Sequence, residues 1–583
     1  MGKHARPAGK NARTAPGSAV RVRPLPIRSA VRLRRPVDIW HKPALSAVAA
    51  LAVPDFALFA LGRLDLILYT SAGAMCALYA HGLPYAARAR TLLWVVLGMV
   101  AGLGVALTAA SLTTSTALLV VLASLVAAVH KMVCDATRIG PPGNLILTFI
   151  AASAFFVPQH LGQVPLHLAL ALGAGGLAWL VCMAPALIRP RGPERIATAR
   201  ALEAAAGLLR TEPGPGGVEP AGVAQARHTA AAAVNAAWHT LFLVPAHTPA
   251  QAAARAGLER LLVRAESALG HEPRSAAAEA ERLTGWAPEL RSGRPLPEIA
   301  LSTAETEELV GVADEAREPR RPAPGRPGVL ARLAPGSPLL PIGARVAAGG
   351  VLAGWASMAV GVGHPYWAVV TAASIHQANT TLSWQRALQR TLGNLLGLLL
   401  YTALLPLLHA GQLAMIVLAL ACQLGAEACI TRNYWLGSVW VTPMALLLTE
   451  FGSRLPARTL IADRWIDTVV GAAVGLACCV LVTNRRAADR IEVALDRVTT
   501  AESAASRLLA TGPASGADDA RETGWARDRL AGGLVELREA VEVAAGEWWQ
   551  RALPEERIAH AEQQGHRALA GLVRRLSAPV PAA

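Results

Sequence analysis

Two long stretches that contain very few charged residues constrain this chain most. Residues 43–189 hold nine charged residues and residues 345–484 hold eleven, in a chain of 583 residues that is 53% hydrophobic and 16% charged. Soluble proteins carry about 25% charged residues. A helix that crosses a bilayer needs about 20 mostly apolar residues, and both stretches are long enough for several such helices. The sequence therefore predicts a polytopic membrane protein with an all-α fold.

Six candidate membrane spans lie in each stretch. In the first stretch they are residues 44–61, 64–81, 91–110, 116–133, 144–158 and 164–188. In the second they are residues 346–363, 365–381, 391–409, 412–430, 433–449 and 465–484. The motif Arg90-Thr91-Leu92 opens the third span and Arg390-Thr391-Leu392 opens the ninth. Because six is an even number, we expect two parallel six-helix transmembrane repeats rather than inverted ones.

Basic residues indicate how the spans are oriented. Residues 1–42 contain eleven Lys or Arg and one Asp. Short cytoplasmic loops are enriched in Lys and Arg. With the tail inside, the inner loops carry most of the basic residues, namely Arg88, Arg90, Lys131, Arg138, Arg386, Arg390 and Arg432. We therefore expect both termini in the cytoplasm, the protein in the inner or plasma membrane, and the basic tail against anionic lipid headgroups.

One loop does not follow this charge bias. Residues 450–464 are expected outside the cell, yet they contain Arg454, Arg458 and Arg464. Asp467 follows in the last span, and its spacing favours an interfacial ion pair with Arg464 over a functional site. We place this loop outside the cell because the charges of the other loops agree with that orientation.

The remaining sequence predicts helical cytoplasmic domains. Residues 190–344 and 485–583 are rich in Ala, Leu, Glu and Arg with helical spacing of the apolar positions, and residues 319–341 contain seven prolines. The predicted organisation is a basic tail (1–42), a first transmembrane half (43–189), a helical domain with a Pro-rich linker (190–344), a second transmembrane half (345–484) and a helical C-terminal domain (485–583).

No motif for enzymatic chemistry is present in the sequence. It lacks the P-loop pattern, HExxH, GxSxG and kinase signatures. The seven cysteines lie in or beside apolar runs, without CxxC pairs or zinc spacing. We expect no enzyme activity, no cofactor, no metal site and no nucleic-acid partner. The sequence is compatible with a homo-oligomer.

Polar residues within the spans are candidates for a transport pathway, since such groups are costly in a membrane. Glu427 has Gln423 four residues before it and Arg432 five residues after it. It could carry protons or couple to a substrate, or it could form a structural ion pair with Arg432 or another arginine at the inner face. Asp55 follows Pro54, which can kink the first span; the alternative is a position near the outer interface.

The eighth span changes character at mid-depth. Its apolar part, from Tyr366 to Ile375, is followed by His376, Gln377 and Asn379. Ten residues of helix span about 15 Å, which is half of a bilayer core. Polar groups at that depth are tolerated inside protein or facing water. We expect a helix that breaks or lines a cavity here, with a plain cytosolic loop as the alternative.

The second half resembles the fusaric-acid-resistance (FUSC) family of aromatic acid exporter-like inner-membrane proteins. The resemblance rests on His364-Pro365-Tyr366-Trp367-Ala368, Thr371, Gln377, Arg386, Arg390, Gly393 and Gly397, and on later segments at Asn433-Tyr434, Thr442-Pro443, Arg464, Asp467-Thr468, Gly471 and Gly475. The Ala- and Arg-rich composition resembles an actinobacterial type. The stretch after Gln377 lacks the proline that we would expect in the family. The resemblance implies export of aromatic carboxylic acids.

These features together predict a membrane transporter that exports small organic anions, such as aromatic carboxylates, by an ion gradient. Arg386, Arg390 and Arg432 suit such a substrate, because a guanidinium matches a carboxylate in two places. Positive-inside topology explains the same arginines without a substrate. Two alternatives remain, a passive anion channel and a membrane scaffold whose cytoplasmic helices recruit partners. We also place Trp367 on the candidate pathway.

Overall fold

The computed structural model describes residues 27–33, 39–211, 221–244, 248–269, 276–297, 299, 333, 337, 339–452, 456–481, 487–512, 517–547 and 553–577. Every regular element within these ranges is a helix, so the predicted all-α class is confirmed. Most of the basic tail and of the Pro-rich linker lies outside the described residues.

Eight helices are long and apolar enough to cross a membrane. They are α2 (His41–Ala60), α4 (Tyr85–Leu112), α5 (Thr116–Thr137), α7 (Val164–Met183, with the short η3 before it and α8, Pro185–Ile188, after it), α15 (Leu340–Ala359), α17 (Thr380–Leu408), α18 (Gln412–Ile430) and α20 (Ala457–Leu481). The prediction of a multi-pass membrane protein is confirmed.

The other four predicted spans correspond to shorter apolar helices. Residues 64–78 form η1 (Leu64–Leu66), α3 (Ile67–Ala74) and η2 (Met75–Leu78) in succession. The remaining three are α6 (Leu145–Ala154), α16 (Tyr366–Ile375) and α19 (Tyr434–Gly452). α6 and α16 have ten residues each, which is too short to cross a bilayer core of about 30 Å alone.

Three predicted boundaries are wrong in the same direction. α4, α17 and α20 begin six to eleven residues before the predicted spans at 91, 391 and 465. The predicted loops that carry Arg88, Arg386 and Arg390 are therefore helical, and so is much of the region 450–464. A span predicted from hydropathy stops at the first charge, whereas these helices continue because their charged side chains find partners.

Close helix packing holds the apolar helices together at glycines. A Cβ on Gly73 of α3 would lie 2.0 Å from the carbonyl oxygen of Ala171 in α7. A Cβ on Gly471 of α20 would lie 2.6 Å from the carbonyl oxygen of Ala368 in α16. Only glycine permits such approaches of two backbones. The halves also pack on each other, α5 against α15 and α18 against α2.

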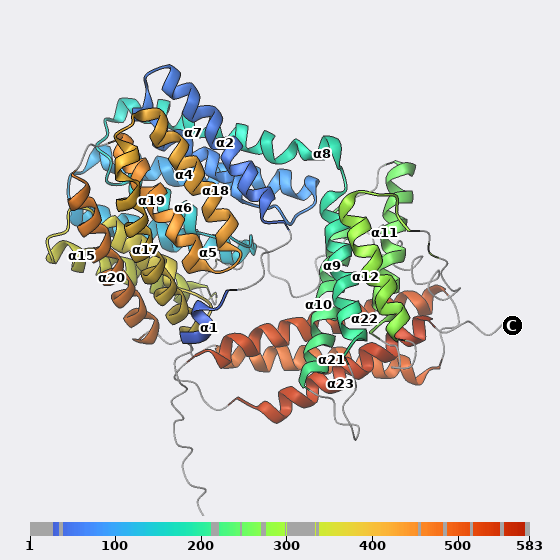
Figure 1. Ribbon diagram of the computed structural model, residues 1–583. Helices are drawn as coiled ribbons and strands as arrows, with labels where there is room; N and C mark the ends of the chain where they lie inside the picture. The colour runs from blue at the N-terminus through green and yellow to red at the C-terminus, as the bar shows by residue number, and fades with distance from the viewer. Residues whose placement is uncertain are drawn as a thin grey trace, which may run out of the picture.

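Seven further helices form a bundle at one end of the apolar helices, as Figure 1 shows. Four follow the first half: α9 (Gly192–Leu209), α10 (Ala221–Phe242), α11 (Pro249–Ser267) and α12 (Ala276–Ser292). Three follow the second: α21 (Ala487–Ala510), α22 (Ala517–Ala545) and α23 (Glu555–Ser577). Leu208, Ala230 and Leu269 share one apolar cluster with Leu530 and Leu572, so the two sequence segments pack together.

A buried ion pair also joins these segments. The Nε of Arg527 in α22 lies 3.2 Å from Oε1 of Glu266 in α11, and the two side chains are 1% and 5% exposed. The indole of Trp238 in α10 donates to Oε2 of Glu266 at 3.0 Å. Since a buried charge without its partner is costly, this contact fixes α22 on the first segment.

The short α1 (Ile27–Val31) lies on the bundle side of the apolar helices (Figure 1). The carbonyl of Ala30 accepts hydrogen bonds from the amides of Gln389 and Asn433, at 2.8 and 2.9 Å. The indole of Trp435 donates to the carbonyl of Val31. This part of the tail therefore docks on α17 and on the start of α19.

Candidate anion site

Arg390 lies inside the second half and not in a loop. Its position, ten residues into α17, is about 15 Å from the start of that helix. The side chain is buried; its Nε donates to Thr371 of α16 at 3.3 Å and its Nη1 to the Tyr434 hydroxyl of α19 at 2.9 Å. Arg386 lies one turn earlier, with its guanidinium 3.8 Å from the centre of the Tyr434 ring.

Arg464 of α20 brings a third guanidinium to the same region. It is 2% exposed and lies over the ring of Trp367 at 3.7 Å. Its charge interacts with those of Arg390 and Asp467. Its Nε and Nη1 are buried and have no hydrogen-bond partner within the described structure. Two free donors on a buried cation are a strong acceptor-binding arrangement.

The expected ion pair between Arg464 and Asp467 is not formed in the part of the chain that the structure describes, and both side chains are buried in protein. Asp467 is fully buried, its Oδ1 accepts a short hydrogen bond from Ser357 of α15, and its Oδ2 has no partner. The prediction failed because spacing along the chain does not give side-chain direction. Arg464 turns instead to the face of Trp367, a favourable place for a cation.

We use the name arginine centre for Arg386, Arg390 and Arg464. Buried hydroxyl and amide groups continue from it, since Asn394 donates to Thr468 at 2.8 Å and accepts from Thr442 at 2.7 Å. Arg464 interacts with Arg390 and Asp467, and Asp463 acts on Asp467, so the three arginines of the centre outnumber the two aspartates beside it. A buried excess of positive charge is unfavourable without an anion to balance it.

Aromatic rings lie beside the arginine centre. The rings of Tyr366 and Trp367 are 4.8 Å apart. Phe149 of α6 packs on Trp367 at 5.3 Å, and Phe156, just after α6, packs on Tyr366 at 5.5 Å. The cluster thus joins the two halves of the chain and places flat apolar surface next to the guanidinium groups, as an aromatic carboxylate requires.

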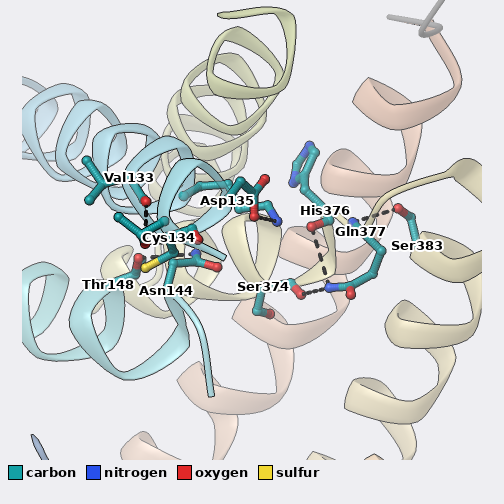
Figure 2. Close-up of polar contacts among 11 residues, drawn as sticks. Val133, Cys134, Asp135, Asn144, Thr148, Ser374, His376, Gln377 and Ser383 are labelled. Atoms are coloured by element: carbon teal, nitrogen blue, oxygen red, sulfur yellow. Dashed lines mark hydrogen bonds and ion pairs between the residues drawn. The ribbon is translucent and has the colours of Figure 1, made fainter. Parts of the chain in front are cut away.

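The predicted break after the eighth span is present. α16 ends at Ile375, His376 is extended, and α17 begins at Thr380. Figure 2 shows Gln377 bridging the gap: its backbone N–H donates to Ser383 of α17 at 3.0 Å, and its amide donates to the carbonyls of Ser374 and His376. The alternative, a cytosolic loop over 376–385, is too long, because residues 380–385 are helical and the loop is confined to 376–379.

The residues at this break are mostly buried in protein. His376 and Asn379 are 3% and 4% exposed, while Ala378 is exposed. Nδ1 of His376 contacts the carbonyl of Ala372 at 2.6 Å, and its Nε2 has no partner in the described residues. Arg345 of α15 and Lys131 of α5 act electrostatically on this imidazole. Two basic side chains therefore act on the break. A water-filled cavity at this position stays a prediction.

Glu427 lies on α18, apart from the arginine centre. Its Oε1 accepts a weak hydrogen bond from Gln423 at 3.5 Å, as the spacing of four suggests. Arg432 is exposed after α18, and Glu427 pairs neither with it nor with another arginine of the described residues, because Gln423 is the one side chain that acts on Glu427 there. The structural ion-pair interpretation of Glu427 is wrong, because Arg432 lies beyond the helix end and turns to solvent. The functional interpretation is untested.

Asp55 is 3% exposed in α2, directly after Pro54, and its Oδ1 has no partner in the described structure. Its side chain is therefore covered by protein, and its depth in the membrane stays a prediction. α2 packs against α18, the helix that carries Gln423 and Glu427. No group of three or more His, Cys, Asp or Glu side chains within the described ranges is arranged to hold a metal ion.

The sequence did not place Arg464, Asn394 or Thr468 on the candidate pathway, although Arg464 and Thr468 belong to the stretch that resembles the family. A signal for Arg464 was present: it violates the charge bias of the loops, as a buried functional arginine can. The seven cysteines are unpaired, and six of them are buried. This agrees with their interpretation as small apolar residues.

Residues 352–478 match the model of the family described as "Fusaric acid resistance protein-like". The resemblance read from the sequence is confirmed over this segment. It contains α16, α18, α19 and every residue of the arginine centre. With the eight long apolar helices, the match establishes a multi-pass membrane protein.

Two curated relatives are similar to parts of the chain. The uncharacterized membrane protein YvaC of Bacillus subtilis is 31% identical over 196 residues, which is 33% of this chain and 29% of the relative. The uncharacterized protein slr1298 of Synechocystis is 29% identical over 140 residues, which is 24% of this chain and 18% of the relative. The chain thus covers less than a third of the length of either relative. No solved structure matches this chain.

Proposed function

We propose that this protein is a transporter that exports small organic anions, and aromatic carboxylates in particular, across the cell membrane. The observation that carries the proposal is the buried guanidinium of Arg464, whose Nε and Nη1 lack partners in the described structure. A carboxylate would accept from these donors and balance the charge of the arginine centre. The aromatic cluster at Trp367 would receive the ring of the same molecule.

The proposal includes an orientation and an energy source. The helical bundle and both ends of the chain lie in the cytoplasm, in keeping with the basic tail. An ion gradient drives export, with Glu427 and Asp55 as the carboxylates that could carry protons. Both are intramembrane carboxylates, and no P-loop is present in the sequence to supply ATP energy.

Benzoate flux in proteoliposomes tests the proposal. Hydrogen bonds to a charged group contribute about 1.5–3 kcal/mol, which corresponds to about 10- to 150-fold in binding. Arg464→Gln should therefore lower benzoate flux at least tenfold. Arg458→Gln is the matched control, because Arg458 is exposed on the same helix. Melting curves of both variants in detergent show whether a loss of flux comes from a loss of folded protein.

The same assay separates the alternatives. Flux that depends on a pH gradient supports a coupled transporter, whereas flux that follows only the membrane potential indicates a passive channel. Equal benzoate flux in the two arginine variants would remove Arg464 from the pathway. A protein without benzoate flux under any gradient, but with a partner bound at the helical bundle, would indicate a scaffold.

A further inference from the structure

The C-terminal end of α22 contacts the break between α16 and α17 through four hydrogen bonds. The N–H and the hydroxyl of Thr381 donate to the carbonyl of Gly546 at 2.9 and 2.7 Å. The hydroxyl of Thr380 donates to Oε2 of Glu547 at 2.6 Å, and the amide of Asn379 donates to the carbonyl of Glu542 at 3.2 Å. A cytoplasmic helix thus ends on the point where the eighth span is interrupted.

The contact leaves room only for a glycine at position 546. A Cβ at this position would lie 2.2 Å from the side chain of Asn379. Asn379 cannot move away without loss, because its Oδ1 caps α17 by accepting from the N–H of Leu382 at 2.8 Å. Any larger residue at 546 must therefore break the cap or separate the two segments.

The contact covers the break. Asn379, Thr380 and Glu547 are between 1% and 8% exposed. The Glu547 carboxylate is held at the first residue of α17 by the Thr380 hydroxyl, four residues after His376. Its Oε1 is buried and without a partner in the described structure. The tail therefore places its own carboxylate where an organic anion would enter.

α22 also connects this point to the rest of the bundle. Arg527, which pairs with Glu266 of α11, lies 19 residues before Gly546, and 19 residues of helix span about 28 Å. One helix, α22, thus links the ion pair with α11 to the contact at the break. Together these contacts have the form of a two-state element that the bundle can bias.

We propose that residues 542–547 form a latch that closes the break between α16 and α17, and that release of the latch opens the cytoplasmic entrance to the arginine centre. This inference rests on the proposed transport function and describes its regulation. In the closed state the Glu547 carboxylate occupies the entrance, and movement of α22 within the bundle withdraws it.

Thiol labelling tests the latch without a transport assay. In a background without native cysteines, Ile375→Cys and His376→Cys report on the break. Gly546→Ala should raise their labelling rate by a membrane-impermeant reagent applied to the bundle side at least tenfold. The matched control is Gly532→Ala on α22, where an added Cβ meets nothing within 4 Å. Unchanged labelling in Gly546→Ala, in protein that melts like the control, would overturn the latch.

Benzoate flux provides the second measurement. Gly546→Ala should raise basal flux several-fold relative to Gly532→Ala. A reducible cross-link between Thr380→Cys and Glu547→Cys should lower it until a reductant is added. Full flux in the cross-linked protein would overturn the regulatory role. If labelling rises but benzoate flux is absent from every variant, the latch stands and the proposed transport function fails.

Discussion

For Glu427 the structure removes one of the two roles considered, that of an ion-pair partner. It has no ion pair with Arg432, so Glu427→Gln leaves no arginine uncompensated. We expect this variant to express and melt like the parent, because the amide keeps the size and the hydrogen bond to Gln423. If Glu427 carries protons, benzoate flux driven by a pH gradient should fall more than tenfold. The measurements are a melting curve in detergent and flux with and without the gradient.

Arg432→Gln is the control for this experiment. A loss of stability in Glu427→Gln that Arg432→Gln restores would show an ion pair after all, at a cost of about 3–5 kcal/mol when broken. Normal gradient-driven flux in a stable Glu427→Gln would move the search for the coupling group to Asp55 and His376.

The sequence predicted a pathway role for some residues at the arginine centre and in the aromatic cluster beside it, but not for others. Arg390 and Trp367 were found because they lie in a stretch that resembles a known family. Arg464 was assigned to an interfacial pair because it lies three residues from Asp467, and its stacking on Trp367 depends on contact with α16. Such contacts between helices distant in sequence have no local signal.

The helices themselves were predictable from hydropathy, but their starts were not. α17 continues for eleven residues before the predicted span because Asn379 caps it and Arg390 is satisfied by Thr371 and Tyr434. The break after Ile375 was predictable, since polar residues follow a half-length apolar run. The contact of that break with α22 was not, because it joins residues about 165 positions apart.

The two transmembrane halves have matching elements, although the predicted repeat stays a prediction. α4 and α17 have 28 and 29 residues, and each follows a short interrupted span. The contacts between the halves come in matched pairs, α5 on α15 with α18 on α2, and α16 on α6 with α19 on α3. Two halves related by an axis along the membrane normal would make such pairs.

Two histidines lie where α10 meets α23, and they make this junction sensitive to pH. The rings of His228 and His566 are 6.3 Å apart. Burial, together with the charges of His228 and Arg227, lowers the pKa of His566 from 6.5 to about 4. Burial also lowers the pKa of His228, with Arg538 acting in the same direction and Glu562, Glu542 and Glu539 opposing it.

A histidine whose pKa is lower in the folded state stabilises the fold fully above its unfolded pKa of 6.5. Protons bind the unfolded state more strongly between pH 6.5 and pH 4, so stability falls as the pH falls through this window, by about 3 kcal/mol for His566. The hydrogen-exchange protection factors of α10 and α23, which correct for the pH dependence of intrinsic exchange, should fall between pH 7 and pH 5. The variant His566→Gln should exchange with a weaker pH dependence, and an identical pH profile would exclude His566 as the cause.

At the scale of the whole molecule, the orientation of the second half depends on the short segment between α19 and α20. This segment was the exception to the charge bias, with Arg454, Arg458 and Arg464. Arg464 is now accounted for, because it is buried within the helices and does not face a loop. Asp463 lies 2.9 Å from His364, which begins the turn before α16. Among the described residues of this segment, exposed Arg458 is the arginine that still departs from the charge bias. Arg454 lies outside the described residues.

We accordingly predict that Pro456 lies outside the cell. A cysteine at this exposed position should be labelled by a membrane-impermeant thiol reagent applied to whole cells, as should Thr114→Cys and Ala410→Cys in the turns after α4 and α17. Arg432→Cys, exposed before α19, should react only after the membrane is opened. Reaction of Pro456→Cys only in opened membranes would mean that α19, although it packs along α17 and α18, does not cross the bilayer. The second half would then contain an odd number of crossings, α20 would run in the opposite direction, and the matched contacts between the halves could not arise from a parallel repeat.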